Sequence, residues 1–164
     1  MAHVSSEKKV RRRFRQQAAW GRLALLAMLA ATLCNQLLLA SGIEYHLLFS
    51  AAAPYYLNWV CRELRLTGSF SAAAAVLTAA QYGAYFTFWA LSKRNRHWLA
   101  AALGLYAVDT LLLLFFALTL LKTAVSCALE LLCHGICICI LLMAIHAAGQ
   151  LSRIPQRRRT AHSL

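Results

Sequence analysis

Charged residues, and acids above all, are scarce in this chain of 164 residues. Only five residues are Asp or Glu, and charged residues of both signs make up 13% of the sequence, whereas about a quarter of a soluble domain is charged. Hydrophobic residues make up 61%, and they are gathered in long runs without charge. This scarcity excludes an ordinary soluble domain and indicates an integral membrane protein.

Catalytic motifs are also missing. The sequence contains no glycine-rich phosphate loop, no nucleophile elbow and no paired zinc-binding histidine motif. Ser126 and the one histidine deep in an apolar run, His134, do not amount to a catalytic triad. We therefore expect no bound cofactor and favour a protein that is not an enzyme, with an intramembrane enzyme as the open alternative.

Cations are abundant, but their distribution along the chain is uneven. Of the seventeen Lys and Arg residues, fourteen lie near the start of the first apolar run, between the second and third, or after the last. The other three are Arg62, Arg65 and Lys122. The positive-inside rule therefore predicts cytoplasmic N and C termini. Anionic lipids at the cytoplasmic face account for the basic tails, so we expect no nucleic-acid partner.

Four apolar segments predict an all-α polytopic membrane protein with four transmembrane helices. These helices are expected over residues 18–41, 70–92, 98–121 and 124–148. The expected organisation is a basic cytoplasmic tail (1–17), a transmembrane domain (18–151) in the inner or plasma membrane, and a second basic cytoplasmic tail (152–164).

The first apolar segment has an alternative interpretation as a cleaved signal peptide. It follows a basic stretch, and the small residues Ala40, Ser41 and Gly42 resemble a cleavage site. However, the apolar stretch continues past Asn35 and Gln36 and is long enough to span a bilayer. We expect the segment to stay attached.

The segment over residues 42–69 is unusually apolar for an outer loop. Pro54 interrupts it, and Tyr55, Tyr56 and Trp59 follow. These aromatic residue types favour the boundary between membrane and water. The segment is too short and interrupted to span, so we expect a short interfacial or partly re-entrant helix with an aromatic anchor.

Asp109 and His134 are the leading candidate functional residues. They are equally far from the expected turn near Leu121 and Lys122, so an antiparallel hairpin brings them to the same depth. An ionisable group in hydrocarbon costs about 2.5 kcal/mol or more, which makes it a candidate site by default. We expect these two side chains to be neighbours.

Further polar residues extend this candidate site. Glu130 lies one helical turn outward of His134, and Thr78, Gln81 and Tyr85 form one stripe on the second segment. Thr78 and Gln81, like Asn35 and Gln36, are interpreted first as hydrogen-bond partners between helices. The complete candidate site is Asp109, His134, Glu130, Gln81 and Tyr85.

Two functions are compatible with this candidate site. In the first, it binds a small solute or relays protons. In the second, the chain is a structural or regulatory subunit whose polar network locks the helices together. Burial disfavours charged forms, whereas a close Asp–His pair favours them, so the residues alone leave both functions open.

The cysteine pattern predicts neither a metal site nor a disulfide framework. Glu130, His134 and Cys137 share one face at permissible ligand spacing. Cys133 and Cys139 point away from that face, and buried cysteines are usually small apolar fillers. A bridge between Cys61 and Cys127 is conceivable, although geometry restricts it strongly.

Small residues recur four apart in two of the segments. The pairs are Ala79 with Gly83, Ala80 with Ala84, and Ala100 with Gly104. Such pairs let helices approach closely, within one chain or between copies. They predict close packing in the bundle and make a homodimer an open alternative.

Four short strings resemble a family of small four-helix bacterial membrane proteins without an assigned function. They are residues 48–54 (LFSAAAP), 108–111 (VDTL), 129–134 (LELLCH) and 151–155 (LSRIP). The chain departs from the family pattern at Glu130, where Asp is frequent, and at Gly135, where a bulky residue is common. The resemblance covers most of residues 20–155. It implies a bacterial inner-membrane protein and no particular activity.

Overall fold

The chain is helical over most of its length. The computed structural model describes residues 2–43, 45–119 and 124–153, without the side chains of 2–8 and 124–127. Its helices are α1 (Ala2–Ala40), α2 (Ala52–Glu63), α3 (Ser69–Leu91), α4 (His97–Thr119) and α5 (Ala124–Arg153). No strand occurs in the described ranges, so the fold is all-α there.

Among the described residues, three helical stretches are long and apolar enough to cross a membrane. They are Lys9–Ala40, His97–Thr119 and Ala128–Arg153. The prediction of four transmembrane helices is therefore wrong, because α3 is not among these stretches. Although α3 has 23 residues and no charge, its polar content, Gln81 above all, lowers its mean hydropathy. Sufficient length and the absence of charge therefore do not by themselves make a helix apolar enough to cross a membrane.

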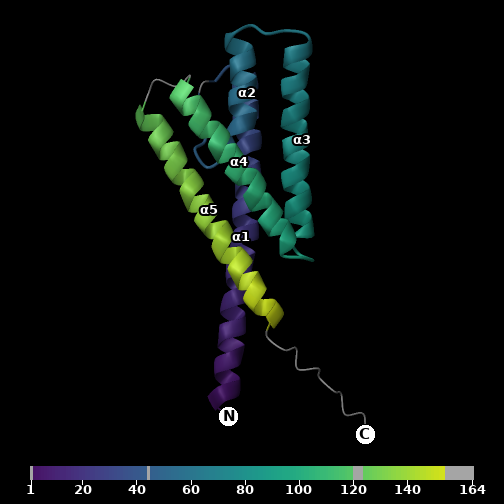
Figure 1. The fold of residues 1–164 in the computed structure, drawn as a ribbon, viewed down its shortest axis with the longest axis vertical. Coiled ribbons are helices and arrows are strands. Elements are labelled where there is room, and N and C mark those ends of the chain that lie inside the picture. Colours follow the sequence, from purple (N-terminus) through teal and green to yellow (C-terminus); the bar gives the residue numbers. More distant parts are fainter. Residues whose placement is uncertain (1, 44, 120–123, 154–164) are drawn as a thin grey trace.

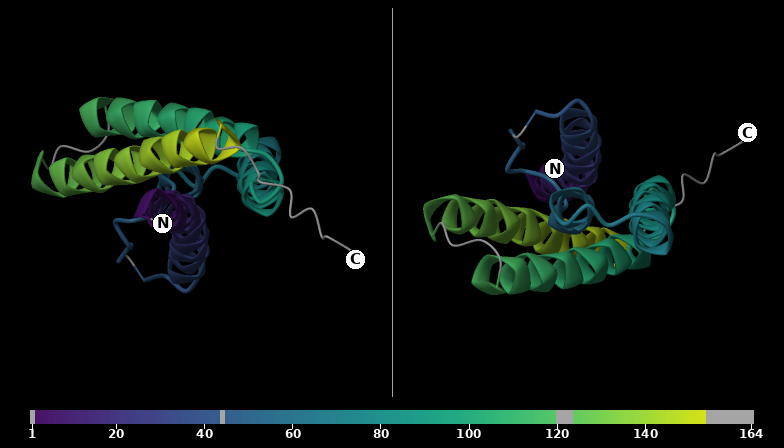
Figure 2. Two further views of the ribbon diagram at one scale, coloured as in Figure 1. Left: turned by 90° about the horizontal axis from the view of Figure 1, so that it is seen from below. Right: turned by 90° about the horizontal axis from the view of Figure 1, so that it is seen from above.

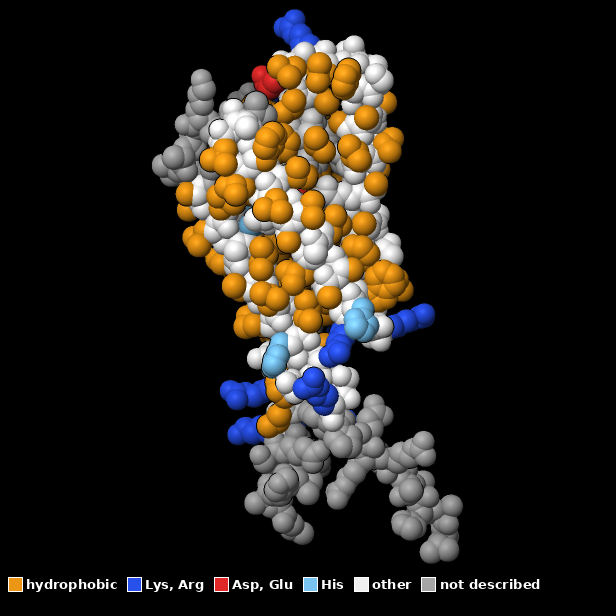
Figure 3. Space-filling view, in the orientation of Figure 1, with side chains coloured by type: hydrophobic (Ala, Val, Ile, Leu, Met, Phe, Trp, Pro, Cys, Tyr) orange, Lys and Arg blue, Asp and Glu red, His pale blue; other side chains and the backbone are white. Residues whose placement is uncertain are grey.

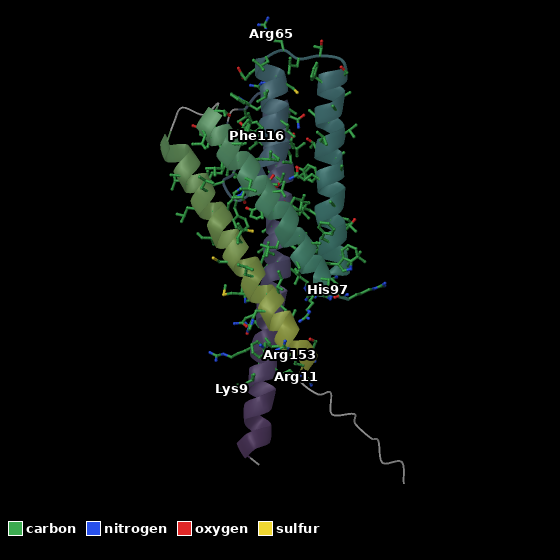
Figure 4. The ribbon with its side chains drawn as sticks, in the orientation of Figure 1. Lys9, Arg11, Arg65, His97, Phe116 and Arg153 are labelled. Carbon is green, nitrogen blue, oxygen red and sulfur yellow. The ribbon has the colours of Figure 1, made fainter. Side chains whose placement is uncertain are left out.

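The helices lie roughly side by side along one long axis (Figure 1). α4 and α5 cross the bundle together, and α3 runs beside α4. Lys9, Arg11 and Arg153 lie at one end of the molecule, whereas Arg65 lies at the other (Figure 4). Seen from above, α2 lies between α1 and the α4–α5 pair (Figure 2). The short helix therefore occupies the middle of the bundle.

The closest helix approach lies where α1 crosses α5. A Cβ atom at Gly21 would collide with the Cβ atom of Ala144, and Leu25, Met28 and Leu141 are fully buried around this crossing. Gly83 and Gly104, in contrast, have open space where a Cβ would lie. Close packing therefore occurs at Gly21, and not at the predicted glycines of α3 and α4.

The second apolar cluster surrounds the first half of α2. Tyr55 and Tyr56 are only 6% and 4% exposed, and they pack with Leu39, Leu113 and Phe116. The prediction of an interfacial helix is thus wrong for this half of α2, because the segment enters the bundle before it turns outward. The re-entrant alternative stays a prediction.

The surface divides into an apolar middle and a basic end (Figure 3). Hydrophobic side chains cover the middle of the visible face, and most visible Lys and Arg side chains gather at the lower end. Large side chains such as Leu37, Phe70, Val76 and Leu118 are well exposed. Exposed apolar surface of this extent indicates contact with lipid or with partner helices.

Candidate functional site

The carboxylate of Asp109 binds the N-terminus of α2. Asp109 lies on α4 and is 1% exposed. Its Oδ2 atom accepts the N–H of Ala52 at 2.8 Å, and its Oδ1 atom accepts the N–H of Ala53 at 2.9 Å. Gln81 of α3 donates its Nε2 to Oδ1 at 2.9 Å. A helix N-terminus carries the positive end of the helix dipole, so the acid is placed where a negative charge is most favourable.

Every backbone N–H group at the start of α2 that lacks a partner within the helix has an acceptor elsewhere in the bundle. The first four N–H groups of a helix have no partner within it. Ala51 donates its N–H to Oγ1 of Thr32 at 2.8 Å, Ala52 and Ala53 donate to Asp109, and Pro54 has no N–H. No side chain of the segment itself caps the helix. The start of α2 is therefore stable only while α1 and α4 supply the acceptors.

The non-helical backbone before α2 is held by Asn35 of α1. The Oδ1 atom of Asn35 accepts the N–H of Leu47 at 2.6 Å, while Nδ2 donates to the Leu47 carbonyl at 3.0 Å and to Ser50 Oγ at 2.8 Å. Irregular backbone is tolerated at membrane depth where protein surrounds it. Asn35, interpreted from the sequence as a bond between helices, instead holds the non-helical segment that precedes α2.

His134 lies close to Asp109 but does not bond to it. The two groups are near enough to interact electrostatically, yet the Nδ1 atom of His134 lies 3.0 Å from Oγ1 of Thr110. Successive helical residues point about 100° apart, so Asp109 faces α2 and α3 while Thr110 faces α5. The predicted neighbourhood is present, but a direct Asp–His hydrogen bond is absent from this described pair.

The rest of the His134 environment is largely apolar. Its ring stacks on Tyr106, with the ring centroids 4.7 Å apart, and the side chain is fully buried. The Ser50 backbone lies near the imidazole. No hydrogen bond of acceptable geometry reaches Nε2 from the described residues.

Glu130 belongs to a second cluster, nearer the end of the molecule that carries Arg65. Glu130 is 1% exposed, and its Oε2 atom accepts the hydroxyl of Tyr56 at 2.7 Å. The same oxygen lies 3.5 Å from Nε2 of His46, whose side chain is 20% exposed. His46 also stacks on Tyr55, with centroids 5.0 Å apart. In the described ion pairs, the only basic side chain near this buried carboxylate is thus a histidine.

Sequence reasoning missed His46 and Tyr56 as members of the site. Both lie in the segment interpreted as interfacial, which concealed their contact with α5. The one available signal was a histidine inside the apolar stretch 45–53. Ionisable residues in apolar stretches are candidate functional residues, and the same reasoning that selected His134 applied to His46.

Gln81 and Tyr85 lie in the layer of Asp109, as expected from their spacing. Gln81 donates to the acid, and Tyr85 is 1% exposed in the core. Thr78 takes part in a separate set: Asn58 of α2 donates its Nδ2 to Oγ1 of Thr78 at 2.8 Å and to Oε1 of Gln36 at 3.3 Å. The polar stripe of α3 therefore forms hydrogen bonds with both α4 and α2.

The cysteines are dispersed through the bundle. Cys137 is buried, Cys133 is partly buried and Cys139 is exposed, all as free thiols. Cys61 is also a free thiol, while the side chain of Cys127 lies outside the described residues. Among the described side chains, no three His, Cys, Asp or Glu are grouped as a metal site.

Comparison with known proteins gives no match. No family model matches the sequence, and neither a curated protein nor a solved structure is similar to it. The resemblance to small bacterial membrane proteins therefore stays a prediction, and the geometry of the site carries the functional argument.

Proposed function

We propose that this chain is a small integral membrane protein that conducts protons across the membrane, and that His46, Glu130 and His134 form the part of the path that leads from one membrane face into its core. The observation that carries the proposal is the distance of 3.5 Å between Nε2 of His46 and Oε2 of Glu130. These two atoms belong to a partly exposed imidazole and a buried carboxylate. Imidazole exchanges protons near neutral pH, so His46 suits the entrance of such a row.

The next step of the row follows the axis of α5. Glu130 and His134 are four residues apart on this helix and therefore share a face, and Glu130 is close enough to act on His134 electrostatically. The Tyr56 hydroxyl donates to Glu130 and holds the carboxylate in a fixed orientation. Nε2 of His134 has no hydrogen-bond partner among the described residues, which leaves a site for an arriving proton.

In this proposal Asp109 anchors α2 and does not carry protons. Three donors already occupy its two oxygens, and these hydrogen bonds hold the side chain against the start of α2. A solute that replaced Asp109 at the helix N-terminus would have to supply equivalent acceptors. Proton transfer is therefore better supported than the binding of an anionic solute at this position.

The structural alternative has its own observation in its favour. The bonds between Asp109 and the start of α2 form a lock between distant parts of the chain. A structural or regulatory membrane subunit would need this lock and no proton movement. The two functions therefore differ in what they require of Glu130 and His46.

In the proposed orientation, the chain lies in the inner or plasma membrane with its basic end on the cytoplasmic side. Support comes from the gathering of Lys and Arg at that end (Figure 3) and from the positive-inside rule. His46 and Glu130 then face the outer side. Anionic lipids of the cytoplasmic leaflet are the proposed partners of the basic end, and a homodimer is an open proposal for the exposed small residues of α3 and α4.

Proton movement into liposomes tests the proposed function. Purified protein is reconstituted around a trapped pH-sensitive dye, and a pH step is applied outside. We expect the wild-type protein to accelerate the change in internal pH over protein-free liposomes, and Glu130→Gln to abolish the acceleration. Thr119→Ala, an exposed change on α4, is the matched control. Equal rates for wild type and empty liposomes would leave the structural alternative as the better account.

A further inference from the structure

A basic cavity lies at the end of the bundle remote from Arg65. Its volume is about 360 Å³, and it is bounded by α1, by the turn between α3 and α4, and by α5. Four cations line it, and none of its lining residues is acidic: the cations are Arg22, Lys93, Arg94 and Arg96. The concentration of positive charge in a concave site predicts an anionic ligand.

The cations converge on this cavity from separate elements. Arg22 comes from α1 and is partly buried. Arg96 reaches across to α5, where its Nη1 atom lies 2.6 Å from the position of a Cβ at Gly149. Lys93 lies over the ring of Trp89, 5.3 Å from its centroid. Guanidinium groups bind phosphate oxygens in pairs, so a phosphate group suits this arrangement.

An apolar groove begins about one helical turn from the basic cavity. It lies between α1 and α3 and has a volume of about 420 Å³, with Leu26, Leu29 and Leu33 on one side and Tyr82, Gly83 and Phe86 on the other. Arg22 and Leu26 are four residues apart and thus share one face of α1. The same helix face therefore runs from positive charge to hydrocarbon surface.

We propose that the basic cavity binds the phosphate of an anionic membrane phospholipid, one acyl chain of which lies in the groove between α1 and α3. Charge complementarity selects the headgroup, and the continuity of cavity and groove along α1 selects a lipid over a free anion. This inference rests on the membrane association of the chain and is independent of the proton row at Glu130.

Lipid titration followed by native mass spectrometry tests this site on the full-length protein in mild detergent. Phosphatidylglycerol and phosphatidylcholine with identical acyl chains are compared, with inorganic phosphate as competitor. We expect phosphatidylglycerol to bind more tightly, and Arg22→Gln to raise its Kd about fivefold, as for one cation near an anionic headgroup. Arg65→Gln, at the opposite end, is the matched control and leaves the Kd unchanged. Arg94→Gln, on the exposed turn, gives the same test if Arg22→Gln does not fold.

A second variant tests the acyl-chain groove. Gly83→Leu fills the groove, and a Cβ at this position has no neighbour within 4 Å, so the bundle accommodates it. We expect the Kd for long-chain phosphatidylglycerol to rise about threefold through lost van der Waals contact, while that for a short-chain analogue is unchanged. Gly104→Leu, which is equally open, is the control. The proposal is overturned if the protein binds the two headgroups with equal affinity, or if Arg22→Gln and Arg65→Gln have equal effects. It is also overturned if Gly83→Leu and Gly104→Leu have equal effects, or if inorganic phosphate displaces the lipid while Gly83→Leu has no effect.

Discussion

The carboxylate of Asp109 accepts the backbone N–H of Ala52 at 2.8 Å across a sequence separation of 57 residues. This bond places the start of a short helix in the interior of the bundle. Because Ala53 and Gln81 donate to the same carboxylate, one side chain connects α4 with α2 and α3. The stability of the re-entrant segment therefore depends on Asp109.

Replacing Asp109 by Asn is expected to destabilise the protein. Both carboxylate oxygens accept hydrogen bonds, so one of these acceptors becomes an amide NH₂ that faces a backbone donor. A buried donor left without an acceptor costs about 1–3 kcal/mol, and loss of the charge at the helix N-terminus adds to this. We predict a loss of about 3 kcal/mol in unfolding free energy, measured by denaturant titration in detergent. Unchanged stability would show that Asp109 does not hold α2.

His46 and Glu130 are expected to be energetically coupled. Nε2 of His46 lies 3.5 Å from Oε2 of Glu130, so the removal of either side chain deprives the other of its partner. A double-mutant cycle with His46→Gln and Glu130→Gln should give a coupling of about 1 kcal/mol in the free energy of unfolding. Additive effects of the two substitutions contradict an interaction between these residues.

The hairpin of α4 and α5 is expected to cross-link most efficiently through Thr110 and His134. These side chains approach within 3.0 Å, whereas Asp109 faces away toward α2. In a background without native cysteines, Thr110→Cys with His134→Cys should form a disulfide faster than Asp109→Cys with His134→Cys. The reverse order of rates would indicate that α4 is rotated from the orientation described.

The orientation of the chain is predicted from its cations. Reporter fusions after Leu164 and after Asn95 should lie on the same side of the membrane, because the two apolar helices α4 and α5 separate them. The positive-inside rule predicts that this side is the cytoplasm. An external reporter after Leu164 is incompatible with the proposed placement of the basic end.

Sequence reasoning identified much of the buried polar layer because an ionisable side chain in an apolar run is costly to expose to hydrocarbon and is therefore expected in the interior of the bundle. Asp109, Glu130 and His134 are all buried, and Gln81 joins Asp109 as its spacing suggested. The role of Asp109 was not predictable in this way, because its partners are backbone N–H groups that have no side-chain signature. The re-entrant path depends similarly on Thr32 and Asn35, whose bonds to backbone atoms leave no pattern in the sequence.

The number of membrane-spanning helices was predicted wrongly for a physical reason. Absence of charge and sufficient length selected α3, but its many alanines contribute little hydropathy to balance Gln81 and the hydroxyl residues. His46 was missed because the segment that carries it was assigned to the membrane surface. Burial of Tyr55 and Tyr56 around α2 reverses that assignment and brings His46 to Glu130.

Infrared difference spectroscopy of the carboxyl C=O stretch tests the central claim most directly. Spectra of the purified protein are recorded between acidic and alkaline pH for wild type, Glu130→Gln and Asp109→Asn, each shown to be folded by circular dichroism. Protonation of a buried carboxylate produces a carboxyl C=O band. We predict a pH-dependent band that Glu130→Gln removes and Asp109→Asn retains, because the proposal assigns proton exchange to Glu130 and the anchoring of α2 to Asp109. A band that disappears in Asp109→Asn and persists in Glu130→Gln would contradict this assignment.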